Sequence, residues 1–292
     1  MVVNRLSQQV MAGHLSPFSS DDFYYVIDKT SRAPERLVLV GGQALEVWGV
    51  VLNVAPPPSI EKNEAHFHAL TIDADWLGQK TDAEWLSNLL GIDHTELCIP
   101  EIGDPTPSTA ILYLERGGRV MLMDFLATIT GLKNPELMKY AAEVPIDLPD
   151  GRTVPLRVLD PVHCLVSRIA NLKAYESKRN GSGPIQATWA VDILRAYLNY
   201  MVEHGAPEKI IRKQCHRVAE LAEFGSKAAE FCFIHYQIDP LVAIDASVVA
   251  AGGGDFARTD WPNTVARIQR KRAKWIAKAE TRSHSASVPK FC

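Results

Sequence analysis

The feature that most constrains the fold is an apolar stretch that ends at two consecutive glycines. Residues 36–40 (RLVLV) are typical of a buried strand, and Gly41 and Gly42 follow directly. Residues 43–50 then carry apolar side chains with the spacing of a helix that leaves a tight turn. This strand, glycine turn and helix predict an α/β core in the first half of the chain.

Two aspartates follow the next predicted strand. We expect an exposed, proline-containing loop at residues 53–65 and a strand at residues 66–72, with Asp73 and Asp75 at its end. Alternate residues of an extended chain point to the same face, so the two carboxylates are predicted to lie close together. They repel each other unless a cation lies between them, and hard oxygen ligands of this kind suit Mg²⁺.

A third acid lies inside an apolar strand. Asp124 belongs to the predicted strand at residues 119–125, which a hairpin turn at Gly117 and Gly118 joins to residues 111–114. An unpaired carboxylate is expensive to bury in such a strand, and a metal ion removes that cost. Three acids on two strands, behind a glycine turn, predict a site for two metal ions and a nucleoside triphosphate.

These motifs resemble the signature of the polymerase-beta-like nucleotidyltransferase superfamily, and within it the AbiEii/AbiGii toxin-like group. The resemblance covers roughly residues 36–194 and rests on four segments: residues 39–42 (LVGG), 70–75 (LTIDAD), 122–124 (LMD), and the helical residues 159–172 with Asp192. It implies a nucleotidyltransferase-like mixed sheet and transfer of a nucleoside monophosphate with release of pyrophosphate.

The resemblance also implies the roles of the three acids. Asp73 and Asp75 would bind both metal ions, while Asp124 would bind one of them and help to deprotonate the acceptor hydroxyl. Mg²⁺ is the expected metal in this two-metal site, and Mn²⁺ is a possible substitute.

The predicted nucleotide-binding residues come from the glycine turn and from the later helical segment. Backbone N–H groups at the turn would approach the triphosphate, because glycine permits close contact and a helix N-terminus favours anions. Basic side chains would neutralise the phosphates. The residues concerned are Gly41, Gly42, Gln43, Arg168 and Lys173. Gln43 departs from the usual Ser or Thr of the family, and Arg168 replaces the Lys usual in the toxin-like group.

The chain changes character after residue 158, where long amphipathic segments begin. We expect an α/β (α+β) catalytic core at residues 1–158, a helical domain at 159–250 and a basic C-terminal helix and tail at 251–292. That last helix carries cations and two tryptophans in the pattern of an RNA-binding surface, or of an ordinary solvated helix: Arg267, Arg270, Lys271, Arg272, Lys274, Lys278, Trp261 and Trp275.

Composition says more about the location of the protein in the cell than about its activity. The net charge of -3 excludes a chain that binds nucleic acid through overall charge, so any such binding needs a local patch. The five cysteines are scattered and odd in number, and no apolar run is long enough to span a bilayer. We expect a cytoplasmic protein without membrane contact.

The sequence therefore favours a magnesium-dependent nucleotidyltransferase with an NTP donor. The acceptor would be tRNA or protein, and the toxin-like resemblance implies a possible cognate antitoxin. Two alternatives stay open. One is a small-molecule adenylyltransferase of the aminoglycoside-modifying type, and the other is a nucleotide-binding protein of the same fold without turnover.

Overall fold

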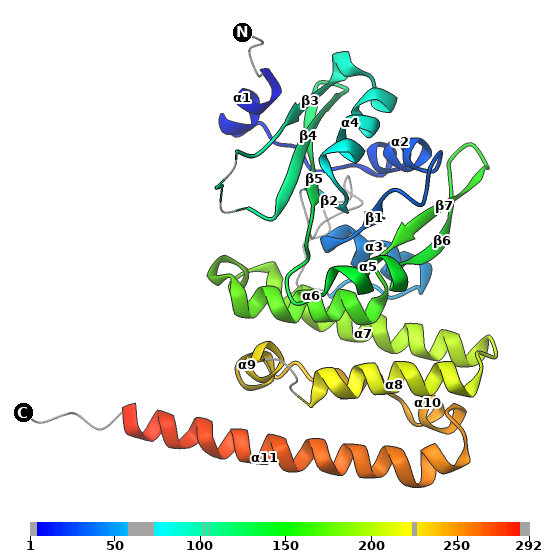
Figure 1. The fold of residues 1–292 in the computed structure, drawn as a ribbon, viewed down its shortest axis with the longest axis vertical. Coiled ribbons are helices and arrows are strands. Elements are labelled where there is room, and N and C mark those ends of the chain that lie inside the picture. The colour runs from blue at the N-terminus through cyan, green and yellow to red at the C-terminus, as the bar shows by residue number, and fades with distance from the viewer. Residues whose placement is uncertain (1–4, 58–72, 102, 105, 224–226, 287–292) are drawn as a thin grey trace, which may run out of the picture. The chain divides into compact units, whose positions relative to one another are not determined.

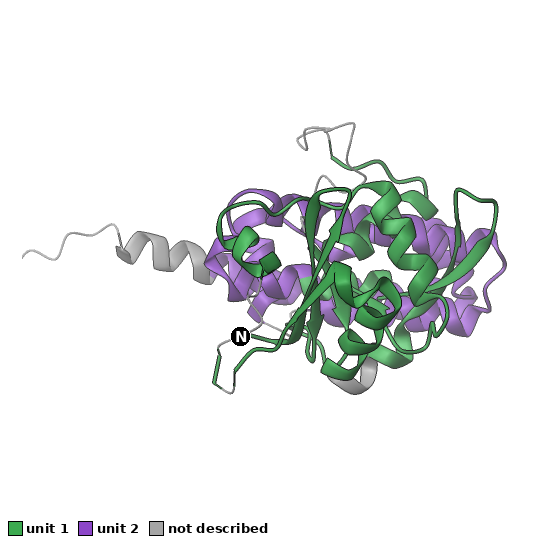
Figure 2. Cartoon of the chain, turned by 90° about the horizontal axis from the view of Figure 1, so that it is seen from above, with its two compact units in different colours: residues 1–167 green, residues 168–292 purple. Residues whose placement is uncertain are grey.

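The chain divides into two compact units, residues 1–167 and residues 168–292 (Figures 1 and 2). The computed structural model describes residues 5–57, 73–101, 103–104, 106–223 and 227–286. The first unit contains a mixed sheet with helices, and the second is helical, so the predicted α/β class with a helical C-terminal region is confirmed. The division falls inside helix α6 (Pro161–Ala174), whereas the sequence placed a boundary at residue 158.

Within the described residues, the sheet has seven strands. Their spatial order is β3 (Thr95–Cys98), β4 (Ser108–Arg116), β5 (Arg119–Leu126), β2 (Asp73–Leu77), β1 (Val38–Leu39), β7 (Thr153–Val158) and β6 (Ala142–Asp147). The β2–β5 and β1–β7 pairs are parallel, and the remaining pairs are antiparallel. The strand at residues 66–72 expected from the sequence lies outside the described residues.

The hairpin that joins β4 to β5 is confirmed. Gly117 and Gly118 both adopt positive φ angles, 59° and 74°, as a two-residue turn of the primed type requires. The β6–β7 hairpin, in contrast, was absent from our sequence prediction. Its two strands place Pro145 opposite Pro155, and prolines within a strand weaken the sequence pattern by which a strand is recognised.

Helices cover the sheet on both sides of β3, β4 and β5. Helix α4 (Lys80–Leu90) and helix α1 (Arg5–Met11) lie on opposite sides of these strands (Figure 1). Under α1, Leu6 packs against Tyr113 and Val120, and the Glu96 carboxylate accepts a 2.6 Å hydrogen bond from the Leu6 backbone N–H. Helix α1 is therefore fixed to the sheet by apolar contact and by a charged cap.

Three further helices belong to the first unit. Helix α2 (Ser20–Thr30) has Ser19 as its N-cap and a complete capping box with Asp22. Helix α3 (Gly41–Val51) includes both glycines in its first turn, whereas the sequence placed them in a turn before the helix. The short helix α5 (Asn134–Tyr140) follows β5.

The second unit contains the long helices that the amphipathic pattern predicted. They are α7 (Ser182–Glu203), α8 (Glu208–Ala222), α9 (Lys227–Tyr236), α10 (Ala246–Ala251) and α11 (Trp261–Ala286). Among the described residues, none of the helices combines the length and apolar character needed to cross a membrane.

The expected basic surface of α11 needs two corrections. Trp261 is only 8% exposed and packs against Phe256, with the ring centres 5.7 Å apart, so it belongs to the core of the helical unit. Arg272 is only 2% exposed, because its guanidinium donates two 2.6 Å hydrogen bonds to Asp239 and lies 4.5 Å from the Phe233 ring centre. Arg272 thus supports the helical unit from inside.

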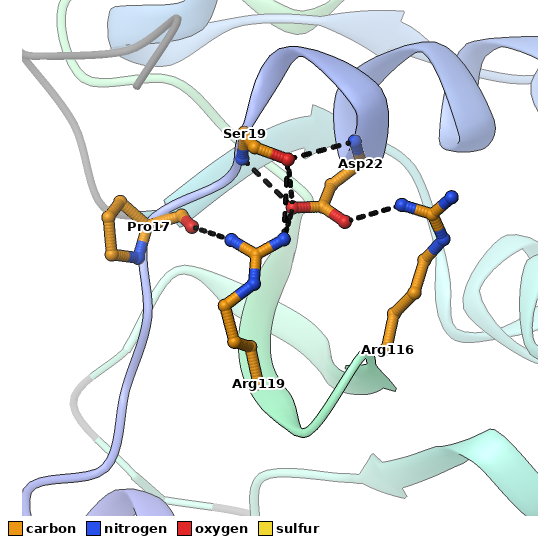
Figure 3. Close-up of polar contacts among 5 residues, drawn as sticks. All are labelled: Pro17, Ser19, Asp22, Arg116 and Arg119. Carbon is orange, nitrogen blue, oxygen red and sulfur yellow. Dashed lines mark hydrogen bonds and ion pairs between the residues drawn. The ribbon is translucent and has the colours of Figure 1, made fainter. Parts of the chain in front are cut away.

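A buried carboxylate joins α2 to the β4–β5 hairpin (Figure 3). Asp22 is fully buried and accepts hydrogen bonds from Ser19, from Arg116 at 2.8 Å, and from Arg119. Burial alone would raise the pKa of the Asp22 carboxyl, but the hydrogen bonds from Ser19 and from the two arginines together outweigh it and lower the pKa. The ionised carboxylate is therefore the form that the fold stabilises.

We expect Asp22→Asn to destabilise the protein by roughly 1.5–3 kcal/mol at pH 7, because it removes a buried charge-assisted network. Since the native pKa is lowered, the contribution of Asp22 is present above its unfolded pKa of about 4 and is lost as the pH falls through the native value. Urea unfolding between pH 3 and 7 measures this. The matched control is Asp21→Asn, at the exposed neighbouring position, and an equal loss in both variants would contradict the assignment.

Candidate functional site

Two of the three predicted acids lie side by side on adjacent strands. Strands β2 and β5 are parallel, and their register places Asp75 opposite Asp124 and Asp73 opposite Leu122. These four side chains share one face of the sheet, while Ala74 points to the other, buried face. The three acids are half-buried. They lie within strands, whereas the sequence placed Asp73 and Asp75 after the end of a strand.

Asp124 is electrostatically strained. Burial raises the pKa of its carboxyl above the ordinary value, a hydrogen bond with the Ser108 side chain opposes that rise, and the charge of Asp73 adds to it. Among the described residues, the buried Oδ1 atom of Asp124 has no hydrogen-bond partner. The site thus holds an under-satisfied acceptor beside a second negative charge, an arrangement that a cation or a proton would relieve.

Gly41 brings the start of α3 against the acids. Its φ angle is +71°, and a Cβ atom built there would lie 1.9 Å from Oδ2 of Asp75. The Val40 N–H donates a 2.9 Å hydrogen bond to the Asp75 carbonyl, which fixes the strand end beside β2. Only glycine permits both this backbone conformation and this close approach.

The first turn of α3 has the properties of an anion site. The N-cap residue Val40 supplies no capping side chain, so the first backbone N–H groups of α3 can bind other partners. Gly42 and Gln43 are buried in the same turn. Gln43 is 1% exposed, and within the described part of the chain neither its Oε1 nor its Nε2 has a hydrogen-bond partner. A buried amide without partners is the kind of group that a bound ligand would satisfy.

The two predicted basic residues belong to the helical unit. Arg168 donates a 2.9 Å hydrogen bond from Nη1 to Oε1 of Gln186, and the Lys173 ammonium lies 4.8 Å from the centre of the Phe231 ring. Asp192, which the resemblance placed in the later segment, pairs with Arg195 at 3.3 Å. All three have local partners within that unit. The predicted roles of Arg168 and Lys173 toward phosphate stay predictions.

The acids fit a metal ion in part. Within the described residues, no three His, Cys, Asp or Glu side chains are gathered closely enough to hold a metal ion together. Asp75 and Asp124 are nevertheless neighbours on adjacent strands, and Oδ1 of Asp124, which has no hydrogen-bond partner among the described residues, is a hard oxygen donor. Magnesium needs only one or two protein carboxylates when substrate phosphates complete its shell, so this donor set suits a metal that arrives with a triphosphate.

Ser108 is the site residue that the sequence did not reveal. It lies on β4 where the register with β5 shifts, and its side chain reaches Asp124 from sixteen residues earlier in the chain. A serine outside the predicted strands carries no signal for this contact, because the contact depends on the irregular pairing.

Comparisons with known proteins add no family to this description, since the chain matches no protein-family model and no curated protein sequence.

We expect Gly41→Ala to destabilise the protein by several kcal/mol, because the new methyl group would displace the Asp75 carboxylate in addition to the strain of positive φ. Gly13→Ala is the matched control, since Gly13 has a φ of +87° and open space around its Cβ position. The control should lose only about 1 kcal/mol in chemical unfolding. Equal losses would show that the contact with Asp75 is unimportant.

We expect Asp124→Asn to stabilise the protein at pH 7 by roughly 0.5–2 kcal/mol, since it removes a buried, repelled charge. The native pKa is raised, so the stability lent by the protonated carboxyl is present below the unfolded pKa near ~4 and is lost as the pH rises through the native value. The gain should therefore vanish at acidic pH. Thermal unfolding at several pH values measures it, with the exposed Asp93→Asn as control; destabilisation at pH 7 would refute the assignment.

Proposed function

We propose that this protein is a magnesium-dependent nucleotidyltransferase of the polymerase-beta-like superfamily, similar to the AbiEii/AbiGii toxin-like group. It would transfer a nucleoside monophosphate from an NTP to a hydroxyl of tRNA or protein. The observation that carries the proposal is the parallel pairing of Asp75 with Asp124, next to the glycine that opens α3.

The start of α3 would hold the triphosphate. Its first-turn N–H groups and the positive end of the helix dipole favour an anion, and Gly41 and Gly42 let the phosphates approach the backbone. The buried amide of Gln43 lies in this turn and would donate to a phosphate oxygen through Nε2. Gln43 would thus take the place of the Ser or Thr hydroxyl of the family pattern.

Asp73, Asp75 and Asp124 would hold magnesium. When bound, the metal neutralises the phosphates and polarises the reacting oxygens. Of the three residues, Asp124 is the one suited to take the proton of the acceptor hydroxyl, because burial and the charge of Asp73 raise the pKa of its carboxyl. Asp73 and Asp75 would orient the donor.

A nucleotide-binding protein without turnover is the second candidate. It is favoured by the lack of a closely gathered set of three metal ligands among the described residues and by glutamine at position 43. Such a protein would bind a triphosphate and release it unchanged.

Transfer of label from α-³²P-labelled triphosphates distinguishes the two candidates. We expect the wild type with Mg²⁺ to release pyrophosphate and to label an acceptor in total tRNA, cell protein or a small-molecule mixture. Asp73→Ala should lower this transfer at least a hundredfold, because a metal ligand is lost. Asp93→Ala, which removes an exposed carboxylate on the 3₁₀ helix at Ile92–His94, should leave it unchanged.

The acceptor fraction that takes up label identifies the acceptor class, and a labelled small molecule would identify the aminoglycoside-type alternative. Binding of triphosphate without pyrophosphate release under every condition would remove the enzyme proposal in favour of the second candidate.

A further inference from the structure

A pocket of about 250 Å³ lies at the turn of the β4–β5 hairpin. Tyr25 of α2, Leu90 at the end of α4, His94, and Leu114 with Arg116 of β4 line it. The Tyr25 hydroxyl donates a 3.3 Å hydrogen bond to the Leu90 carbonyl, which ties two of its walls together. Apolar groups and one cation thus converge on a small, connected cavity.

This pocket is separate from the acidic site. Arg119 is the β5 residue opposite Arg116 in the strand register, next to the turn. It lies five residues before Asp124 on β5, so the turn is about 16 Å along the strand from Asp124. Nothing in the proposed transfer reaction uses the pocket residues. A ligand bound there would leave the catalytic acids accessible.

The Arg116 guanidinium is positioned to bind an anion. Its Nη1 donates to the buried Asp22 carboxylate at 2.8 Å, and its guanidinium lies 4.9 Å from the centre of the Tyr25 ring (Figure 3 shows the former contact). Among the described residues, Asp22 is the only hydrogen-bond acceptor of Arg116, while its side chain is 40% exposed. The guanidinium is held in one place and keeps donors for a further partner.

The charges around the pocket leave an excess of positive charge. Asp22 supplies one negative charge to two arginines, Arg116 and Arg119. Glu115 also lines the pocket, but its carboxylate pairs with Arg5. An arginine fixed by a shared carboxylate and an aromatic ring retains attraction for an anion, and little side-chain entropy is left to lose on binding.

We propose that this pocket binds a small organic anion. A carboxylate or phosphate group would accept hydrogen bonds from Arg116, and a compact apolar body would pack mainly against the Tyr25 ring, because Leu90 and Leu114 are only 3% and 1% exposed. The pocket volume of about 250 Å³ suits one ring or a short chain.

The experiment uses benzoate and phenyl phosphate as probes, with benzamide as the neutral counterpart of benzoate. Titrations of the full chain are followed by NMR at the Tyr25 ring and the His94 imidazole. We expect at least one anion to bind and to shift both signals, with benzoate or phenyl phosphate at least tenfold tighter than benzamide. The stronger of the two anions distinguishes a carboxylate ligand from a phosphate one.

Two matched variants assign the binding to Arg116. Arg116→Gln should weaken binding of the anion by about ten- to a hundredfold, because a charge-assisted pair is lost. Arg119→Gln removes the other arginine that pairs with Asp22, but Arg119 does not line the pocket. The affinity of this variant for the anion should therefore stay within about threefold of the wild-type value. Thermal unfolding verifies that both variants fold.

The proposal is overturned if neither anion binds, if benzamide binds as tightly as the anions, or if Arg119→Gln loses as much affinity as Arg116→Gln. The comparison of anions with benzamide needs only the wild-type protein, so the proposal can be refuted even if a variant does not fold.

Discussion

The parallel pairing of β2 with β5 is the constraint on which the acidic site depends. Its register places Asp75 opposite Asp124, and a slip of one residue would turn the β2 acids toward the buried face that Ala74 and Trp76 occupy. Burial of these two side chains therefore fixes the register. The glycine at the start of α3 depends on the same register, since it fits against the Asp75 side chain. Packing on one face of the sheet thus positions chemistry on the other.

Several features of the site lower the stability of the folded protein. A carboxyl with a raised pKa and a buried glutamine amide without partners among the described residues are each unfavourable in a folded protein. Such features persist where the surrounding structure fixes them, and they gather at sites that bind ligands. Their concentration around Asp124 and Gln43 is the physical argument for function that holds without any relative of known activity.

Much of the architecture, and less of the site, could be predicted from the sequence. The helices and the β4–β5 hairpin follow from local signals: Ser19 as a cap, amphipathic spacing and a Gly-Gly turn. Nonlocal features could not be predicted. The contact of Ser108 with Asp124 arises from an irregular register, and the β6–β7 hairpin was hidden by prolines at paired positions. The sequence marked the acids as candidates, but their pairing is a property of strand order, which spacing along the chain does not encode.

The exposure of an arginine side chain also distinguishes the arginines that stabilise the fold from those that can bind a ligand. In the pair of Arg272 with Asp239, the arginine side chain is 2% exposed and its carboxylate 21%, so the cation is enclosed and no anion can reach it. In the Asp22 cluster the order is reversed: the carboxylate is fully buried, and Arg116 is 40% exposed. The same kind of ion pair therefore stabilises the interior in one unit and presents a fixed guanidinium in the other. A count of basic residues along the sequence treats the two alike, although only the second kind can recognise an anion.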